Sequence, residues 1–229
     1  MSLIELKNVS RIYRLGNQEI RALTDVSLTF EAGEFAVFAG PSGSGKTTAL
    51  NLIGCLDHPT SGQVFVNGVN LGAASKRVLA DFRLQNIGFI FQSYNLIPVL
   101  TAAENAEFTL MLQKVPKSER RAKVLKLFVE LGIDGLEDRR PADLSGGQQQ
   151  RVAIARAMAA EPHVILADEP TANLDSHTAE ELLELMRRLN REQGTTFIFS
   201  SHDDRVITQA RRVIHLHDGC LADDVTISS

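Results

Sequence analysis

The decisive stretch of this 229-residue chain is Gly40-Pro41-Ser42-Gly43-Ser44-Gly45-Lys46-Thr47. An apolar run at 35–38 precedes it and predicts a buried strand, and an apolar run at 46–56 follows it and predicts a helix. Glycines in such a turn let backbone N–H groups point toward one anion, and the helix N-terminus adds positive potential. The spacing predicts a phosphate-binding loop, in which Lys46 reaches the β- and γ-phosphates of a nucleotide and Thr47 ligates magnesium.

Strand and helix patterns alternate along the rest of the chain. Strands are predicted around 26–30, 64–66, 87–91, 164–167 and 195–200, and a helix is predicted at 179–191, ending near Gly194. The dipeptides Asn67-Gly68 and Asp218-Gly219 are predicted to turn two hairpins. This order predicts an α/β fold, with a P-loop NTPase core, a mostly parallel sheet and an N-terminal antiparallel β portion.

Residues from about 93 to 162 show helical periodicity and no strong strand pattern. Within them, Ser118 is predicted to cap a helix that ends at Gly132. We expect this stretch to form a helical lobe inserted in the α/β core. Because the chain shows no internal repeat or obvious linker, residues 1–229 are predicted to form a single domain.

Composition restricts the possible partners. A net charge of -4 argues against nucleic acid, because phosphate binding usually leaves a basic excess. The two cysteines, Cys55 and Cys220, are too few for a disulfide framework; both are predicted to be small core residues, and free thiols suit a reducing cytosol. No secretion signal is recognisable, and no segment approaches the roughly 18–20 apolar residues of a membrane span.

Two carboxylates follow the apolar strand predicted at 164–167. Asp168 is placed to hold magnesium through water, and Glu169 to orient or deprotonate an attacking water. A solvated acidic residue at a strand end is common, and it is the pairing with the phosphate loop that favours catalysis.

A third motif, Leu144-Ser145-Gly146-Gly147-Gln148, opens a helix predicted at 149–160. Its serine and glycines offer a hydroxyl, open backbone amides and the helix dipole to an anion. Taken alone, the same residues would be more typical of an N-cap serine followed by a flexible turn.

Taken in order, these motifs resemble one family. The phosphate loop, the strand-ending Gln92, LSGGQ with QQRVAIARA, VILADEP, the stretch 173–175 and the post-strand His202 resemble the nucleotide-binding subunits of ABC transporters. LSGGQ is the discriminating piece, since phosphate loops occur in many NTPases. The resemblance extends from Tyr13 to the final hairpin and implies ATP and Mg2+ as ligands.

The resemblance also implies individual roles. Tyr13 stacks on adenine, Gln92 touches the magnesium together with Thr47 and Asp168, Glu169 is the catalytic base, and His202 holds the γ-phosphate and the attacking water. The ATP site then contains the loop residues together with further members: Tyr13, Gly40, Pro41, Ser42, Gly43, Ser44, Gly45, Lys46, Thr47, Thr48 and Gln92.

In this family two chains pair head to tail. The resemblance implies an ATP-bound homodimer in which Leu144, Ser145, Gly146, Gly147 and Gln148 of one chain cap the γ-phosphate held by the other. Asp175 belongs to the loop that crosses between the chains.

Three longer stretches, 54–62, 87–105 and 167–175, resemble the lipoprotein-releasing and macrolide-export subgroup, with Ala172 where typical lipoprotein-release members have glycine. The implied partners are integral membrane permease subunits with a large extracytoplasmic domain, which would hold the ATPase at the inner face of the cytoplasmic membrane. A soluble non-transport ABC ATPase and the ATPase of a cell-wall hydrolase-regulating complex remain alternatives. Leu96, Ile97, Val99 and Leu100 are predicted to form either lobe core or a groove for the membrane subunit.

Overall fold

The computed structural model describes residues 2–16, 18–72 and 74–227, and its strands form two sheets. The larger sheet has the strand order β10-β9-β3-β8-β7-β6. Its members are β3 (Phe35–Ala39), β6 (Ile87–Phe91), β7 (Val164–Asp168), β8 (Thr196–Ser201), β9 (Arg212–His217) and β10 (Cys220–Thr226). All neighbouring pairs are parallel except β9 and β10, which form a hairpin. The predicted mostly parallel sheet is confirmed.

The smaller sheet is antiparallel and has the order β2-β1-β4-β5. Its strands are β1 (Ile4–Leu15), β2 (Gln18–Phe30), β4 (Ser61–Val66) and β5 (Val69–Asn70). Asn67 and Gly68 both have positive φ, 49° and 74°, as a two-residue turn between right-twisted strands requires. The predicted antiparallel portion and its hairpin are confirmed.

Strand β3 is buried over its whole length and separates two hydrophobic cores. Phe35 and Val37 pack toward one core with the helices α5 (Gly146–Met158) and α6 (Ser176–Gln193), whereas Phe38 packs toward the other with α1 (Lys46–Ile53) and the antiparallel sheet. Successive side chains of a strand point to opposite faces. A continuous apolar run is therefore what a strand covered on both faces needs.

The remaining helices are α2 (Lys76–Asn86), α3 (Ala102–Leu112), α4 (Lys117–Glu130) and α7 (Asp204–Gln209), with a 3-10 turn at Pro141–Asp143. Sequence patterns had not indicated α2. The prediction that Ser118 caps a helix is wrong: the N-cap of α4 is Pro116, and Ser118 already lies in the first turn. The predicted end at Gly132 is confirmed by its φ of 63°, a left-handed conformation that glycine adopts without steric cost.

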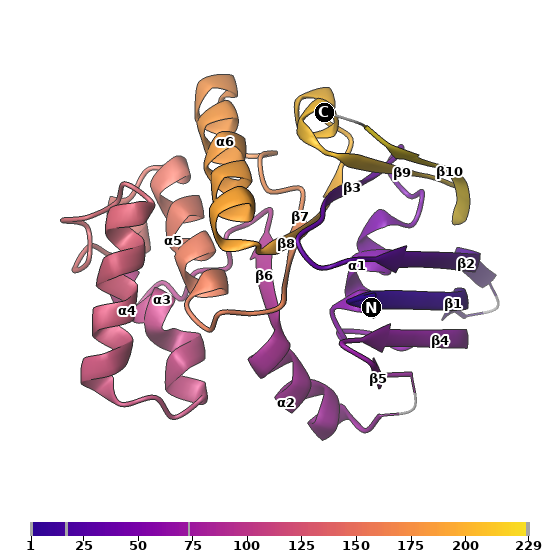
Figure 1. Ribbon diagram of the computed structural model, residues 1–229, viewed down its shortest axis with the longest axis horizontal. Helices are drawn as coiled ribbons and strands as arrows, with labels where there is room; N and C mark the ends of the chain where they lie inside the picture. Colours follow the sequence, from indigo (N-terminus) through magenta and orange to yellow (C-terminus); the bar gives the residue numbers. More distant parts are fainter. Residues whose placement is uncertain (1, 17, 73, 228–229) are drawn as a thin grey trace.

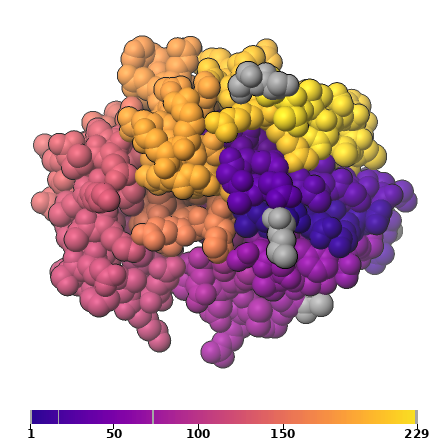
Figure 2. Space-filling view, in the orientation of Figure 1, coloured from indigo at the N-terminus to yellow at the C-terminus, as the bar shows by residue number. Residues whose placement is uncertain are grey.

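Helices α3, α4 and α5 lie between β6 and β7 in the chain and occupy one end of the molecule, at the left in Figure 1 and Figure 2. The antiparallel sheet occupies the opposite end, toward which the β9–β10 hairpin of the larger sheet also extends, and strands β3, β8, β7 and β6 lie between the two ends. The single domain over residues 1–229 and the extent of the helical lobe, about 93–162, stay predictions. Among the described residues, no helix combines the length and apolarity that a membrane crossing requires.

The two cysteines have different surroundings. Cys55 is buried, and burial raises the pKa of its thiol to about 12. Cys220, at the start of β10, is exposed. The prediction that both are core residues is therefore wrong for Cys220, because β10 is the edge strand of its sheet and its side chains remain open to solvent.

Candidate active site

A cavity of 650 Å³ lies where parallel strands of the larger sheet end. The loop after β3, Gln92 after β6, Glu169 after β7 and His202 after β8 all reach it. Carboxyl ends of parallel strands meet at one edge of a sheet, where ligands commonly bind. Its lining includes most of the predicted site residues: Tyr13, Pro41, Ser42, Gly43, Gly45, Lys46, Thr47, Thr48, Gln92, Glu169 and His202.

The phosphate loop has no room for side chains at two of its glycines. A Cβ at Gly40 would lie 2.2 Å from the carbonyl oxygen of Leu216, and a Cβ at Gly45 would lie 2.5 Å from that of Ala22. Both glycines also have positive φ. Within the loop, Ser44 is buried, and its Oγ has no hydrogen-bond partner among the described residues. Close backbone packing therefore accounts for the glycines before any ligand is considered.

Lys46 is buried in the loop that it completes. Its Nζ donates to the carbonyl oxygens of Gly40 at 2.7 Å and Pro41 at 3.0 Å. The ammonium group is thus held at the loop by neutral acceptors, and no carboxylate in the described part of the chain pairs with it. Phosphate oxygens, being anionic, are stronger acceptors for the same donors.

Asp168 is held by two hydroxyl groups. Thr47 Oγ1 donates to Asp168 Oδ1 at 3.1 Å, and Ser200 Oγ donates to the same oxygen. Ser200 is buried and lies opposite Asp168 in the pairing of β7 with β8. Sequence reasoning missed Ser200, although a serine at a buried strand end beside an acidic strand end is a visible signal.

The carboxylate of Asp168 and the hydroxyl of Thr47 are oxygen ligands of the kind that Mg2+ prefers. A protein-bound Mg2+ usually keeps several waters or phosphate oxygens as its other ligands. The described residues contain no group of three or more His, Cys, Asp or Glu side chains that could by itself hold a metal ion.

Glu169 and His202 form the central contact of the cavity. His202 Nδ1 lies 2.7 Å from Glu169 Oε1, and Ser201 Oγ donates to Glu169 Oε2 at 3.4 Å. Glu169 has a φ of 48°, an unusual conformation for a residue other than glycine, and such strain is typical of functional positions. The carboxylate is mostly buried, whereas the imidazole is 68% exposed. The pair can therefore present a buried base and an accessible ring to one ligand.

The segment after β6 is bound to two other elements. Asn173 Nδ2 donates to the carbonyl oxygen of Gln92 at 2.9 Å, which ties the segment to the loop after β7. Arg156 of α5 donates to the carbonyl oxygens of Tyr94 at 2.8 Å and Asn95 at 2.5 Å. Hydrogen bonds from Asn173 and Arg156 thus connect the segment after β6 to the loop after β7 and to α5, a connection that sequence patterns did not reveal.

Ser145 is the N-cap of α5, in a capping box with Gln148. Its Oγ accepts from Gln148 N at 3.3 Å, and Gln148 Oε1 accepts from Ser145 N at 2.9 Å. The helix begins at Gly146, three residues before the predicted start. A Cβ at Gly146 would lie 2.8 Å from Tyr94 Oη, and one at Gly147 would lie 2.5 Å from Thr178 Cγ2. The glycines are thus packed against neighbours rather than forming a loose turn.

The structure does not bring the LSGGQ residues to the cavity of their own chain. None of Leu144, Ser145, Gly146, Gly147 or Gln148 lines it. Asp175 is also outside the lining; it caps α6 by accepting from Thr178 N at 3.0 Å and Thr178 Oγ1 at 2.7 Å. These hydrogen bonds lower the pKa of the Asp175 carboxyl.

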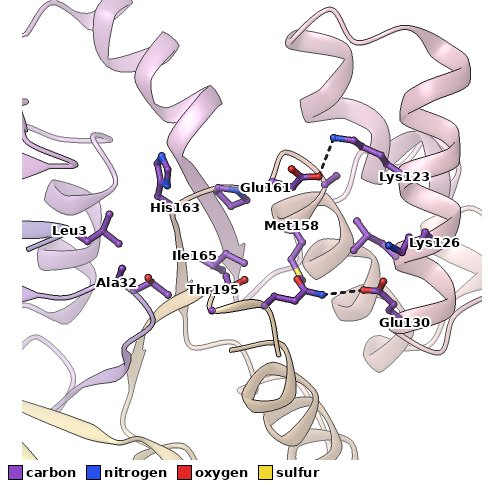
Figure 3. Close-up of a pocket in the computed structure, with 16 residues that line it drawn as sticks. Leu3, Ala32, Lys123, Lys126, Glu130, Met158, Glu161, His163, Ile165 and Thr195 are labelled. Carbon is purple, nitrogen blue, oxygen red and sulfur yellow. Dashed lines mark hydrogen bonds and ion pairs between the residues drawn. The ribbon is translucent and has the colours of Figure 1, made fainter. Parts of the chain in front are cut away.

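A second cavity, of 730 Å³, lies near the amino ends of β7 and β8, away from the strand ends that carry the predicted site (Figure 3). Two polar contacts along it join α4 to the core, Lys123 Nζ to Glu161 Oε1 at 3.1 Å and Gln193 Nε2 to Glu130 Oε2 at 3.3 Å. It contains no predicted site residue. The smaller cavity is the candidate active site.

Comparison with known proteins identifies the family that the sequence motifs resemble. The family model described as ABC transporter matches residues 23–172, which include the phosphate loop, LSGGQ and the acidic strand end. The chain belongs to the ABC transporter family. The fold is that of an ABC ATPase, an enzyme that binds and hydrolyses ATP.

Individual relatives show which subgroup of the family this ABC ATPase resembles. The ABC transporter ATP-binding protein YtrE of Bacillus subtilis is 44% identical, over 98% of this chain and 99% of that protein. The macrolide export ATP-binding/permease protein MacB of Hyphomonas neptunium is 47% identical, over 97% of this chain. The match covers 34% of MacB, so this ABC ATPase spans about a third of the length of that relative. The predicted resemblance to the macrolide-export subgroup is confirmed.

Solved structures agree with the relatives. A dimeric structure of a post-hydrolysis state of the ATP-binding cassette MJ0796, bound to ADP and Pi, superposes with a TM-score of 0.91. Sequence identity to that cassette is 42%, and the match covers 99% of both chains. MJ0796 is an ABC transporter ATP-binding protein of Methanocaldococcus jannaschii.

Proposed function

We propose that this ABC ATPase powers a membrane complex by ATP-driven closing and opening of a homodimer, with separate transmembrane subunits carrying out export or extraction of a substrate. The observation that supports this most directly is the convergence of Lys46, Glu169 and His202 on one cavity. YtrE, matched over its whole length, is named an ATP-binding protein, and MacB is named a joint ATP-binding and permease protein. Both names connect the matched segment to ATP use in transport.

In the proposed site, loop amides and Lys46 bind the phosphates. Thr47, Gln92 and Asp168 would hold Mg2+, which when bound would neutralise phosphate charge. Glu169 accepts a proton from the attacking water, and its contact with His202 keeps both side chains directed at the same ligand. Ser200 restrains the carboxylate of Asp168, and Ser201 restrains that of Glu169, so that neither carboxylate has to reorganise during the reaction.

We infer that LSGGQ acts on the nucleotide of a second chain. Supporting this, Ser145 lies at the N-terminus of a 13-residue helix yet does not line its own chain's cavity. The MJ0796 cassette is described as a dimer with ADP and Pi. A two-fold arrangement would bring Ser145, Gly146 and Gly147 of each chain, with Asp175, to the partner's phosphates.

We propose that the membrane subunit docks beside Val99. Val99 is 74% exposed, whereas Leu96 packs against the core of the lobe. Buried Asn105 holds the backbone of the loop that contains Leu96 and Val99. Its Oδ1 accepts from Ile97 N at 2.7 Å, and its Nδ2 donates to the carbonyl oxygens of Ile97 and Leu100. The loop is thereby rigid enough to present an apolar side chain to solvent.

A groove of 510 Å³ continues this surface between α3 and α4. Leu100, Phe108 and Met111 form its apolar part, and its charged lining is balanced, with Glu104, Glu107 and Asp138 beside Lys117, Arg120 and Arg121. An amphipathic helix that lays its apolar face into the groove fits this lining. Docking there would hold the ATPase at the inner face of the cytoplasmic membrane, and the large extracytoplasmic domain would belong to the docked subunit.

Two experiments test the proposal. Purified protein should release phosphate from Mg-ATP, and the Lys46→Ala variant should not. Affinity purification from native membranes should recover integral membrane subunits, and the Val99→Glu variant should recover far fewer. An active ATPase that recovers no membrane subunit would favour a non-transport ABC ATPase. Recovery of a cell-wall hydrolase with the membrane subunits would favour the regulatory alternative.

A further inference from the structure

Tyr13, the residue expected to stack on adenine, is held by two other side chains. Its Oη donates to Asp57 Oδ2 at 2.8 Å. Arg11 NH2 contacts the other oxygen, Asp57 Oδ1, also at 2.8 Å. The Arg11 guanidinium lies over the Tyr13 ring, 4.5 Å from its centroid. Each of the three side chains therefore contacts the other two.

The three contacts restrict different motions of the ring. Arg11 and Tyr13 are two residues apart on β1, so their side chains leave the same face of the strand. The hydroxyl bond to Asp57 opposes rotation about the side-chain bonds, and the guanidinium covers one face of the ring. Tyr13 also lines the nucleotide cavity, so its other face is the one left for a base.

Asp57 is itself tied to the phosphate loop through α1. The Asp57 amide donates to the carbonyl oxygen of Asn51 at 3.2 Å, within the helix that begins at Lys46. From the same turn, Thr60 Oγ1 accepts from Ile12 N at 3.0 Å, in the strand segment that carries Tyr13. One helix and its exit turn thus connect the phosphate end of the cavity to the residue at its base end.

The cluster is well shielded. The Arg11 and Asp57 side chains are 23% and 22% exposed, and Arg11 Nε is buried without a hydrogen-bond partner among the described residues. An ion pair with little solvent around it is screened less than a surface pair. The contact of an arginine with an aromatic ring is also directional, because the planar guanidinium stacks on the face of the ring. These features suit a rigid support.

We propose that Arg11 and Asp57 are positioning residues for adenine: they hold the Tyr13 ring at the spacing from the phosphate loop that an adenine nucleotide requires. This rests on the proposed stacking role of Tyr13. Neither residue touches the nucleotide in this scheme. Freeing the ring should weaken ATP binding by about three- to tenfold, the effect of having to immobilise an otherwise mobile side chain on binding. Chemistry at the γ-phosphate should be unaffected.

The experiment compares a ligand with a base and one without. Steady-state ATPase assays give KM and kcat for ATP, and inhibition by inorganic tripolyphosphate gives a Ki for the phosphate end alone. Tyr13→Phe keeps the ring and removes only its anchor, and Asp57→Ala removes the acceptor. Both should raise KM for ATP about three- to tenfold, with kcat and the tripolyphosphate Ki unchanged. Glu19→Ala, which breaks the exposed Arg14–Glu19 pair in the same hairpin, is the matched control and should change none of them.

The outcomes separate this proposal from the stacking role on which it rests. Tyr13→Ala should raise KM at least as much as Tyr13→Phe. If Tyr13→Ala has no effect, the stacking role itself is wrong. If Tyr13→Ala raises KM and neither Tyr13→Phe nor Asp57→Ala does, stacking stands and positioning is overturned. A parallel rise in the tripolyphosphate Ki for Tyr13→Phe and Asp57→Ala would also overturn positioning, since the cluster would then act through the phosphate loop.

Discussion

The imidazole Nδ1 of His202 and the carboxylate Oε1 of Glu169 are 2.7 Å apart, although 33 residues separate them in the chain. Adjacent parallel strands β7 and β8 bring their ends together, and each residue directly follows the last residue of its strand. The contact places a proton acceptor and a polar ring at one wall of the nucleotide cavity. Its consequences can be tested at each residue separately.

Replacing Glu169 with Gln should slow ATP hydrolysis by about 10²–10⁴-fold, the usual contribution of a general base. Binding should persist, because the phosphate loop is untouched, and the protein should accumulate as an ATP-bound dimer. Size-exclusion chromatography with and without Mg-ATP measures this, together with phosphate release. A Glu169→Gln protein that stays monomeric in ATP and turns over at the wild-type rate would contradict the assignment.

Lys46→Ala and Ser145→Arg should fail at different steps. The first removes the ammonium group that faces the phosphates, so nucleotide binding should be lost. The second places a bulky cation at the N-terminus of α5, so each monomer should still bind ATP but neither dimerise nor hydrolyse it. Calorimetry measures binding, and chromatography measures the dimer. Equal loss of binding in both variants would contradict the action of Ser145 on the second chain's nucleotide.

Gly147→Ala should destabilise the protein through Thr178, whose Cγ2 would lie 2.5 Å from the new Cβ. Thr178 cannot rotate freely, because its Oγ1 donates to Asp175 Oδ2 at 2.7 Å. Overpacking costs about 1–3 kcal/mol, offset by up to about 1 kcal/mol of helix propensity. Thr178→Ser removes Cγ2 and keeps the hydroxyl, so the double variant should recover most of the loss. Thermal melting of the four proteins checks this; failure of the serine to rescue would exclude the proposed clash.

Val99→Glu and Leu96→Glu should separate docking from core packing. Exposed Val99 should tolerate the charge in the isolated subunit, with unchanged melting temperature and basal ATPase. Lost burial of one apolar side chain, about 1.5–3 kcal/mol, should weaken assembly with the membrane subunit by about one to two orders of magnitude. Leu96→Glu should lower the melting temperature, because Leu96 packs against the lobe core. Unimpaired assembly of Val99→Glu would place the docking surface elsewhere.

The thiols should react with very different pH dependence. At pH 8 an alkylating reagent should label exposed Cys220 and leave Cys55 unmodified, because burial raises the pKa of Cys55 to about 12 and keeps it a thiol. Folding thus favours the protonated Cys55. Its contribution to stability is complete below the ordinary thiol pKa and is lost as pH rises from there toward 12. Mass spectrometry of the native protein should find one label, and two after unfolding.

The parts of the site that depend on local chemistry were predictable. A phosphate loop needs glycines, a lysine and a hydroxyl at fixed spacing between a strand and a helix. The loop at Gly40 to Thr47 can therefore be recognised from the sequence alone. Strand-ending Gln92 and Glu169 could be placed at one sheet edge for a similar reason, because parallel strands share a direction. Ser145 could be identified as an N-cap, since capping involves only the four residues from Ser145 to Gln148.

By itself, then, the sequence determined the α/β class, the nucleotide loop and the family, because each depends on periodicity or on spacing within a short segment. Tertiary structure alone decided which hydroxyls hold Asp168 and Glu169, that Arg11 and Asp57 enclose Tyr13, and that Val99 rather than Leu96 faces solvent. The contacts to Asp168, Glu169 and Asp57 join residues from different elements across 32 to 121 positions in the chain. Such pairs leave no periodic trace, because the strand order and loop packing that create them are set by the burial of both faces of the sheet.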